Sequence, residues 1–167
     1  MADFISAVLR MDHMNNMPVF HIYTVIEFTW ISLFYIKAVP GKKITALITG
    51  LILLFLVLAA YEFRHNMNEM DVLSTTTEAF IVMFYAVLGF SLLLKNPVHS
   101  KVTSIPLFWI NTAFLLYFAG NLFLFIFSSY VQQHFKKEFN ELWGIHSIMS
   151  LIYYLLIATG FWKTKAR

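Results

Sequence analysis

Long apolar runs separated by short polar segments dominate the chain. A helix that crosses roughly 30 Å of hydrocarbon needs about 20 mostly apolar residues, because each residue adds about 1.5 Å. Five runs meet this length, at about residues 17–36, 44–63, 76–94, 104–130 and 141–162. Barrel strands would instead give segments of about 10 residues with alternating polarity. The pattern predicts an all-α, polytopic membrane protein, a bundle of five transmembrane helices in a single domain.

The segment before the first run also carries apolar residues at helical spacing. This spacing predicts that residues 1–16 form a short helix lying in the membrane interface. A cleaved signal peptide is a poor interpretation, because the first run starts late, little basic charge precedes it and four more runs follow.

Composition supports a membrane environment. The 167 residues are 59% hydrophobic and only 13% charged, whereas soluble proteins are about half apolar and a quarter charged. The absence of cysteine excludes disulfides, thiolate metal ligands and cysteine nucleophiles. Lys and Arg are scattered between the apolar runs and form no basic stripe, so we expect no nucleic-acid partner. The expected surroundings are the lipid bilayer, with a second membrane protein or another copy of the chain as partner.

Loop charges predict the orientation of the bundle. The N-terminal segment and the loops after the second and fourth runs lie on one side, which carries four basic residues. The other side carries the remaining eight of the twelve Lys and Arg. The four are Arg10, Arg64, Lys136 and Lys137. Because basic loops stay in the cytoplasm, we expect the N-terminus outside and the C-terminus inside, in the cell inner membrane.

Ionisable side chains inside the apolar runs are the first candidates for function. Placing one in a bilayer costs about 2.5–3.5 kcal/mol on insertion scales. Glu27 lies near the middle of the first run, and Tyr23 and Thr24 precede it on the same helix face. A carboxyl at that depth is expected to be protonated, or paired with a base or cation.

Polar residues from all five runs map to the outer half of the predicted bundle. The last run carries the clearest polar stripe, with side chains at three- and four-residue spacing. That stripe consists of Trp143, His146, Ser147, Ser150 and Tyr154. The other runs add His21, Glu27, Glu62, His65, Glu78 and Asn121. We expect a polar cavity open to the outer face and centred on Glu27 and His146, which makes the protein a sensor or binding module for a ligand or partner. Its further ligand contacts would be Tyr23, Asn121, Ser147, Ser150 and Tyr154.

Several of these residues also have structural interpretations. Thr75 and Glu78 match the S/T-x-x-E capping box at the start of a helix. Glu62 and His65 are equally consistent with solvated groups at a helix end. Asn121, with Ser147 and Ser150, is typical of interhelical hydrogen bonding. His146 also fits a buried histidine bonded to a carbonyl or to Glu27.

Three other functions stay open from the residues alone. A metal-dependent membrane hydrolase would use His21, His65 and His146 as zinc ligands, with Glu27 or Glu78 as general base. A haem protein would use His21 and His146 as axial ligands. A proton path through Glu27 is the third, although five runs without an inverted repeat argue against an ordinary secondary transporter. The H-E-x-x-H, G-x-S-x-G and phosphate-loop motifs are absent.

Overall fold

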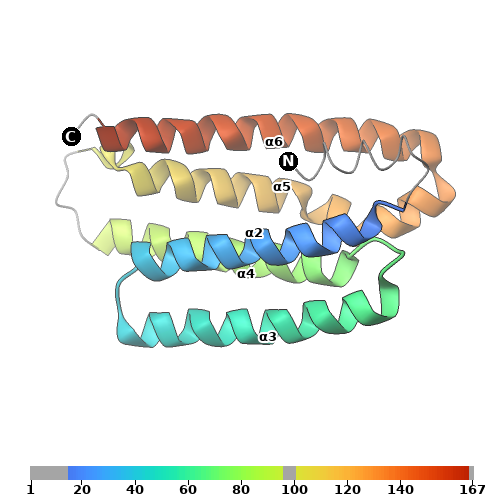
Figure 1. Ribbon diagram of the computed structural model, residues 1–167. Coiled ribbons are helices and arrows are strands. Elements are labelled where there is room, and N and C mark those ends of the chain that lie inside the picture. Colours follow the sequence, from blue (N-terminus) through green and yellow to red (C-terminus); the bar gives the residue numbers. More distant parts are fainter. Residues whose placement is uncertain (1–14, 96–100, 166–167) are drawn as a thin grey trace.

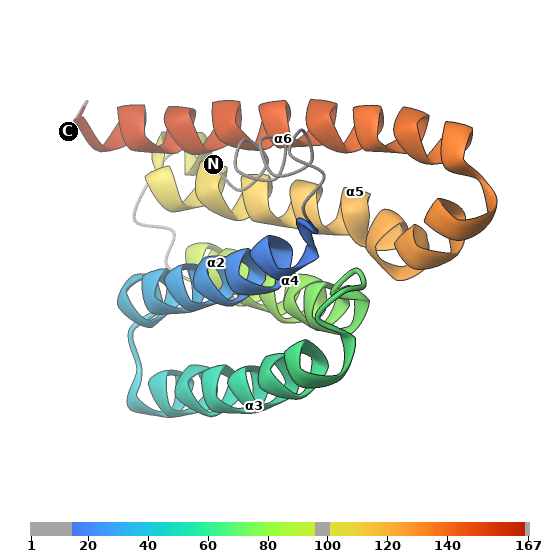
Figure 2. The same ribbon diagram turned by 45° about the vertical axis from the view of Figure 1, so that its right-hand side comes forward.

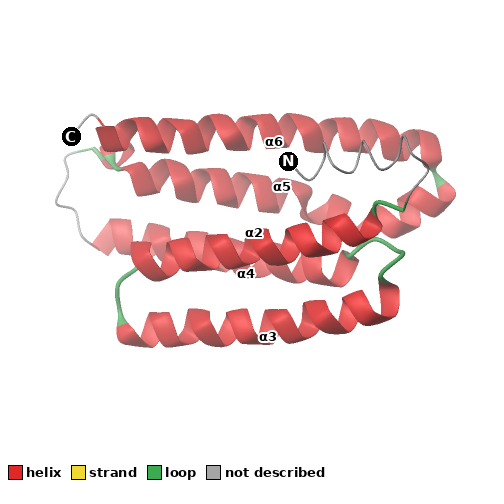
Figure 3. Cartoon of the chain, in the orientation of Figure 1, coloured by secondary structure: helices red, strands yellow, loops and turns green. Residues whose placement is uncertain are grey.

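Five long helices make up the computed structural model, which describes residues 15–95 and 101–165 (Figure 1, Figure 3). They are α2 (Met17–Ala38), α3 (Lys42–Asn66), α4 (Val72–Lys95), α5 (Pro106–His134) and α6 (Lys136–Lys165), with a 3-10 turn, η1 (Val102–Ser104), before α5. All five are long and apolar enough to cross a membrane, which confirms the predicted all-α, five-helix bundle. The interfacial helix expected at 1–16 falls almost wholly outside the described residues.

Proline and glycine mark three of the helix starts. Pro18 and Pro106 lie in the first turns of α2 and α5, where the missing N–H has no helical partner to lose. Gly41 precedes α3 with a φ of 152°, a conformation that side chains disfavour. Gly41 in particular lies in the short connection that turns the chain from α2 back into α3.

The loop expected between the fourth and fifth runs is almost absent. α5 continues to His134 and α6 begins at Lys136, so Phe135 alone joins them. Charged and amide residues do not end a helix, and residues 128–140 contain neither proline nor glycine. Helices of 29 and 30 residues are about 45 Å long, so they exceed the roughly 30 Å of hydrocarbon. The joined ends of α5 and α6 therefore extend beyond the apolar layer.

The helices pack in successive layers (Figure 1, Figure 2). α3 forms one outer layer, α2 and α4 form the next, α5 packs on α4, and α6 lies on the far side of α5 as the opposite outer layer. Phe28 of α2 packs on Phe55 of α3, with ring centroids 4.0 Å apart, and on Tyr85 of α4 at 6.4 Å. Large apolar side chains such as Leu151 and Leu155 of α6 are 60% exposed, which places them against lipid.

Polar side chains also join helices near the α2–α3 end of the bundle. The Tyr35 hydroxyl donates to the Asn111 side-chain oxygen at 2.8 Å and links α2 to α5. A Cβ added at Gly89 would clash with the Asn111 side-chain amide. Gly89 therefore lets α4 approach α5 closely enough to enclose this hydrogen bond.

Glu62 of α3 holds the N-terminus of α4. Its carboxylate accepts the backbone N–H groups of Leu73 and Ser74 at 2.9 and 2.7 Å and the Ser74 hydroxyl, and its side chain is only 3% exposed. A carboxylate at this position accepts hydrogen bonds from N–H groups that have no partner within the helix. Its negative charge is also stabilised by the positive end of the helix dipole. The interpretation of Glu62 as a solvated end group is therefore wrong.

The capping box expected at Thr75 and Glu78 is also wrong. α4 begins at Val72, four residues before the predicted start, so both residues lie within the helix. The Thr75 hydroxyl donates to the Asp71 carbonyl at 2.7 Å. Glu78 is thus available for a role in the interior.

Replacing Glu62 by alanine tests its importance for stability. We expect Glu62→Ala to lower the free energy of unfolding by about 2 kcal/mol, because buried N–H groups of α4 lose their acceptor. The measurement is thermal unfolding of purified protein in detergent, followed by circular dichroism. Glu69→Ala, at an exposed side chain in the following loop, is the matched control and should keep the Tm. Equal Tm values for the two variants would contradict the assigned capping role.

Candidate functional site

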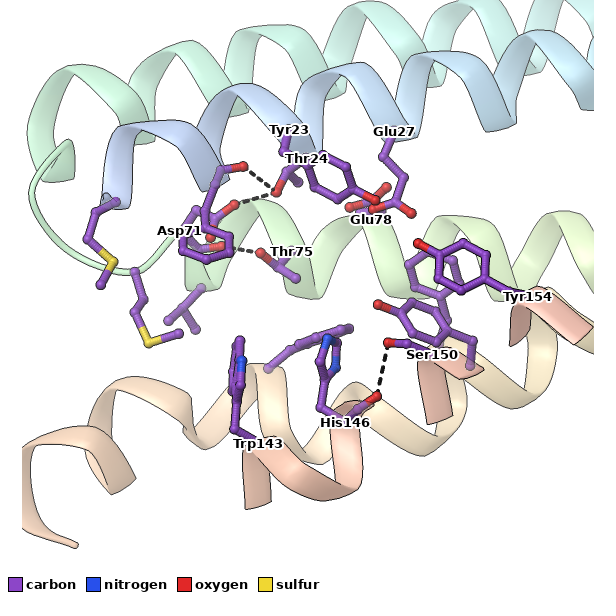
Figure 4. A pocket seen from close by; sticks show the side chains of 17 residues that line it. Tyr23, Thr24, Glu27, Asp71, Thr75, Glu78, Trp143, His146, Ser150 and Tyr154 are labelled. Atoms are coloured by element: carbon purple, nitrogen blue, oxygen red, sulfur yellow. Dashed lines mark hydrogen bonds between the residues drawn. The ribbon is translucent and has the colours of Figure 1, made fainter. Parts of the chain in front are cut away.

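A partly open pocket lies among α2, α4, α5 and α6, beside the loop that joins α3 to α4 (Figure 4). Its volume is about 90 Å³, enough for several water molecules. Carboxyl groups, one imidazole, hydroxyls and aromatic rings line it. Because these groups come from four helices, only the packed bundle forms this site.

Three carboxyl groups lie on one side of the pocket. Glu27 comes from α2, Asp71 from the residue before α4, and Glu78 from α4. Figure 4 shows the carboxyl groups of Glu27 and Glu78 close together between their two helices. Glu78 is the most buried of the three. It is 2% exposed, and its Oε1 has no hydrogen-bond partner within the part of the chain that the structure describes.

His146 faces the acids from α6, and Asn121 of α5 holds its ring. The Asn121 amide nitrogen donates to the Tyr117 carbonyl at 2.8 Å, which directs the amide oxygen toward His146 Nδ1, 3.0 Å away. Nδ1 must therefore donate, and a neutral ring then carries its acceptor lone pair on Nε2. Asn121 is fully buried and does not line the pocket, so it acts as a positioning residue.

Aromatic rings form much of the remaining wall. Trp143 stacks on the His146 ring with centroids 4.9 Å apart. Tyr117 packs on Tyr153 at 4.8 Å and also lines the pocket. Tyr154 contributes another ring from α6. Aromatic rings therefore line the pocket both across from the acids, at Trp143, and beside them, at Tyr154 (Figure 4).

Hydrogen bonds hold the α3–α4 loop against α2. The Thr24 hydroxyl donates to the Asp71 carboxylate. The His21 ring donates through Nε2 to the Glu69 carbonyl at 3.2 Å. Asn15 and Asn68 join through their side chains at 2.9 Å. These contacts place Asp71 at the pocket.

Asp71 is a site residue that the sequence analysis did not single out. The available signal was its place directly before an apolar helix, which is typical of an N-cap. Its side chain, however, contacts Thr24 of another helix. Only the packing of α2 beside the loop reveals this contact.

Most residues expected to contact a ligand do line one pocket. They are Tyr23, Glu27, His146, Ser150 and Tyr154, and Glu78 joins them. Ser147 is not in the lining; it is exposed, and its hydroxyl donates to the Trp143 carbonyl at 3.0 Å. Figure 4 shows Ser150 beside His146, to whose carbonyl it donates.

The residues expected to bind zinc are dispersed. His65 is exposed and bonds to the Tyr61 carbonyl at 2.8 Å, while His21 is buried against the α3–α4 loop. Neither lines the pocket with His146 and Glu78. Among the described residues, no group of three or more His, Asp or Glu side chains is arranged to hold a metal ion. The pair expected to bind haem, His21 and His146, is likewise not joined by this pocket.

The hydrogen bond between Asn121 and His146 predicts one imidazole tautomer. At alkaline pH, where the ring is neutral, we expect the His146 proton on Nδ1, because the Asn121 oxygen accepts it. Nitrogen NMR of ¹⁵N-histidine-labelled protein reports the tautomer, and a His146→Gln spectrum assigns the signal. Asn121→Leu should abolish the preference. An Nε2–H ring in the unmodified protein would rule out the assigned geometry.

Comparisons with known proteins identify no relative. No protein family, curated protein or solved structure matches this chain. The candidate site is therefore defined by the groups that line the pocket and by their contacts.

Proposed function

We propose that this protein is a membrane-embedded binding module that takes up a small ligand in the pocket among α2, α4, α5 and α6. The observation that carries the proposal is the convergence of Glu27, Glu78 and His146 from three helices on one partly open cavity. Ionisable groups in a membrane bundle are expensive and usually mark a functional path or site. Ligand pockets typically combine apolar walls with a few convergent polar groups, as this one does.

Each lining group has a distinct role in the proposal. The Glu27 and Glu78 carboxyls orient the ligand by charge and hydrogen bonding. The Nε2 of His146 provides an acceptor on the facing wall, held in place by Asn121. Tyr23, Ser150 and Tyr154 complete the contact surface. A zinc hydrolase has less support, because His21 and His65 have their own contacts outside the pocket.

The proposal includes an orientation. The pocket lies beside the α3–α4 loop, at the same end of the bundle as the start of α2. Loop charges favour this end as the outer one, because eight of the twelve Lys and Arg, those of the C-terminal segment included, lie on the opposite side. The pocket would then receive its ligand from outside the inner membrane or from its outer leaflet.

Single cysteines test whether the pocket is open, because the chain has none of its own. Ser150→Cys places a thiol in the lining, and Ser147→Cys places one on an exposed, lipid-facing part of the same helix. In nanodiscs we expect N-ethylmaleimide to modify Ser150→Cys at least about tenfold faster, because a thiolate forms in water and not in lipid. Intact-protein mass spectrometry gives both rates. A slower or equal rate at position 150 would refute an open polar pocket.

Cysteine labelling in cells tests the orientation. Met67→Cys lies in the α3–α4 loop and Lys42→Cys lies at the opposite end, and both side chains are exposed. A membrane-impermeant maleimide should label Met67→Cys on intact cells, after removal of the outer membrane where one is present. It should label Lys42→Cys only after permeabilisation. The reverse pattern would place the pocket on the cytoplasmic side and overturn the proposed orientation.

A further inference from the structure

We infer that the ligand of this pocket is a small organic cation, a protonated amine carried on an apolar body. The inference rests on the proposed function and specifies the class of ligand for that same site. Its basis is the presence of three carboxyl groups and several aromatic rings in the lining of one cavity.

The charge of the lining is strongly one-sided. Glu27, Asp71 and Glu78 line the pocket, and none of its described lining residues is Lys or Arg. Carboxylates gathered in a low-dielectric site repel one another and need a positive partner or protons. His146 uses Nδ1 to donate to Asn121, so a neutral ring offers the ligand an acceptor. The lining hydroxyls of Thr24, Thr75 and Ser150 already donate, to the Asp71 carboxylate, the Asp71 carbonyl and the His146 carbonyl. The pocket is therefore suited to a ligand that donates hydrogen bonds.

Glu78 supplies an observation independent of the acidic cluster. Its side chain is 2% exposed, lines the cavity, and leaves Oε1 without a hydrogen-bond partner within residues 15–95 and 101–165. A buried acceptor without a partner costs about 1–3 kcal/mol. An ammonium group has three donors and would satisfy this oxygen together with the neighbouring Glu27 carboxyl.

The aromatic part of the lining favours an organic cation over a metal ion. The described acids and histidines do not converge in the manner of metal ligands. Instead, Trp143, Tyr117 and Tyr154 line the same cavity, with Trp143 across from the acids and Tyr154 beside the Glu27 and Glu78 carboxyls (Figure 4). Aromatic faces attract ammonium groups and also pack against apolar carbon. Phe118 and Phe125 extend this apolar surface.

Protection of a pocket thiol tests the inference. In the Ser150→Cys protein in nanodiscs, we measure the rate of modification by N-ethylmaleimide with benzylamine, which is protonated at neutral pH, or with benzyl alcohol, its neutral counterpart of similar shape. We expect benzylamine to slow the reaction at a concentration at least about tenfold lower than benzyl alcohol requires, because only the amine is charged. Ser147→Cys should show no protection by either compound.

The outcomes separate this inference from the proposed function. Equal protection by both compounds, or none by benzylamine at a thiol that reacts readily, would overturn the cation assignment and leave the open pocket standing. Failure of position 150 to react faster than position 147 without any compound would instead refute the pocket proposal itself.

Charge-removing variants identify the groups responsible. In the Ser150→Cys background, Glu78→Gln and Glu27→Gln each keep the side-chain shape and should raise the benzylamine concentration for half-protection about tenfold or more. Glu69→Gln, an exposed acid outside the pocket lining, is the matched control and should not change it. An unchanged labelling rate without benzylamine verifies that each variant keeps the pocket. Unchanged protection in both pocket variants would overturn the assignment.

Discussion

The buried carboxylate of Glu62 on the N-terminus of α4 determines much of how this bundle is organised. The first N–H groups of a helix have no partner within the helix, and a buried or membrane-embedded end must find acceptors elsewhere. Glu62 supplies them from α3, in contacts with Leu73 and Ser74. With α4 anchored in this way, the short loop that precedes it lies against α2 and places Asp71 and Glu78 beside Glu27.

The two ends of the bundle use buried polar groups differently. Near the α2–α3 loop, Tyr35 and Asn111 bond directly and Gly89 allows the helices to close over them. Near the α3–α4 loop, acids from α2 and α4 face a cavity, and His146 lies across it. Directly bonded polar groups stabilise helix packing even though the Asn111 amide nitrogen has no hydrogen-bond partner within the described residues, whereas polar groups around a cavity make interactions available to a ligand. This contrast is why the proposed function belongs to the second end.

Some features of the site could be predicted because the membrane penalises them. Glu27 and His146 were identifiable as a pair, since ionisable residues are rare inside apolar runs and need a reason to be there. Asp71 was not, because an acid in a loop carries no such penalty, and Thr24 contacts it from a different helix. Ser147 was expected to face inward with Ser150, yet it lies on the exposed side of α6. A polar stripe at helical spacing is wider than the part of the helix that the neighbouring helices cover.

The sequence by itself determined that the chain forms five membrane-spanning helices, because hydrocarbon thickness sets the length of each run and the enclosed backbone must satisfy its own hydrogen bonds. It did not determine the helix ends, since charged residues continue a helix as readily as apolar ones, as α5 and α6 demonstrate. The roles of two glutamates depended on tertiary structure alone. Glu78 has the spacing of a cap and lines the pocket, whereas Glu62 has the position of a solvated end group and caps α4. Which acid reaches the open N–H groups is decided by how α3 packs beside α4, and that geometry is not encoded in local spacing.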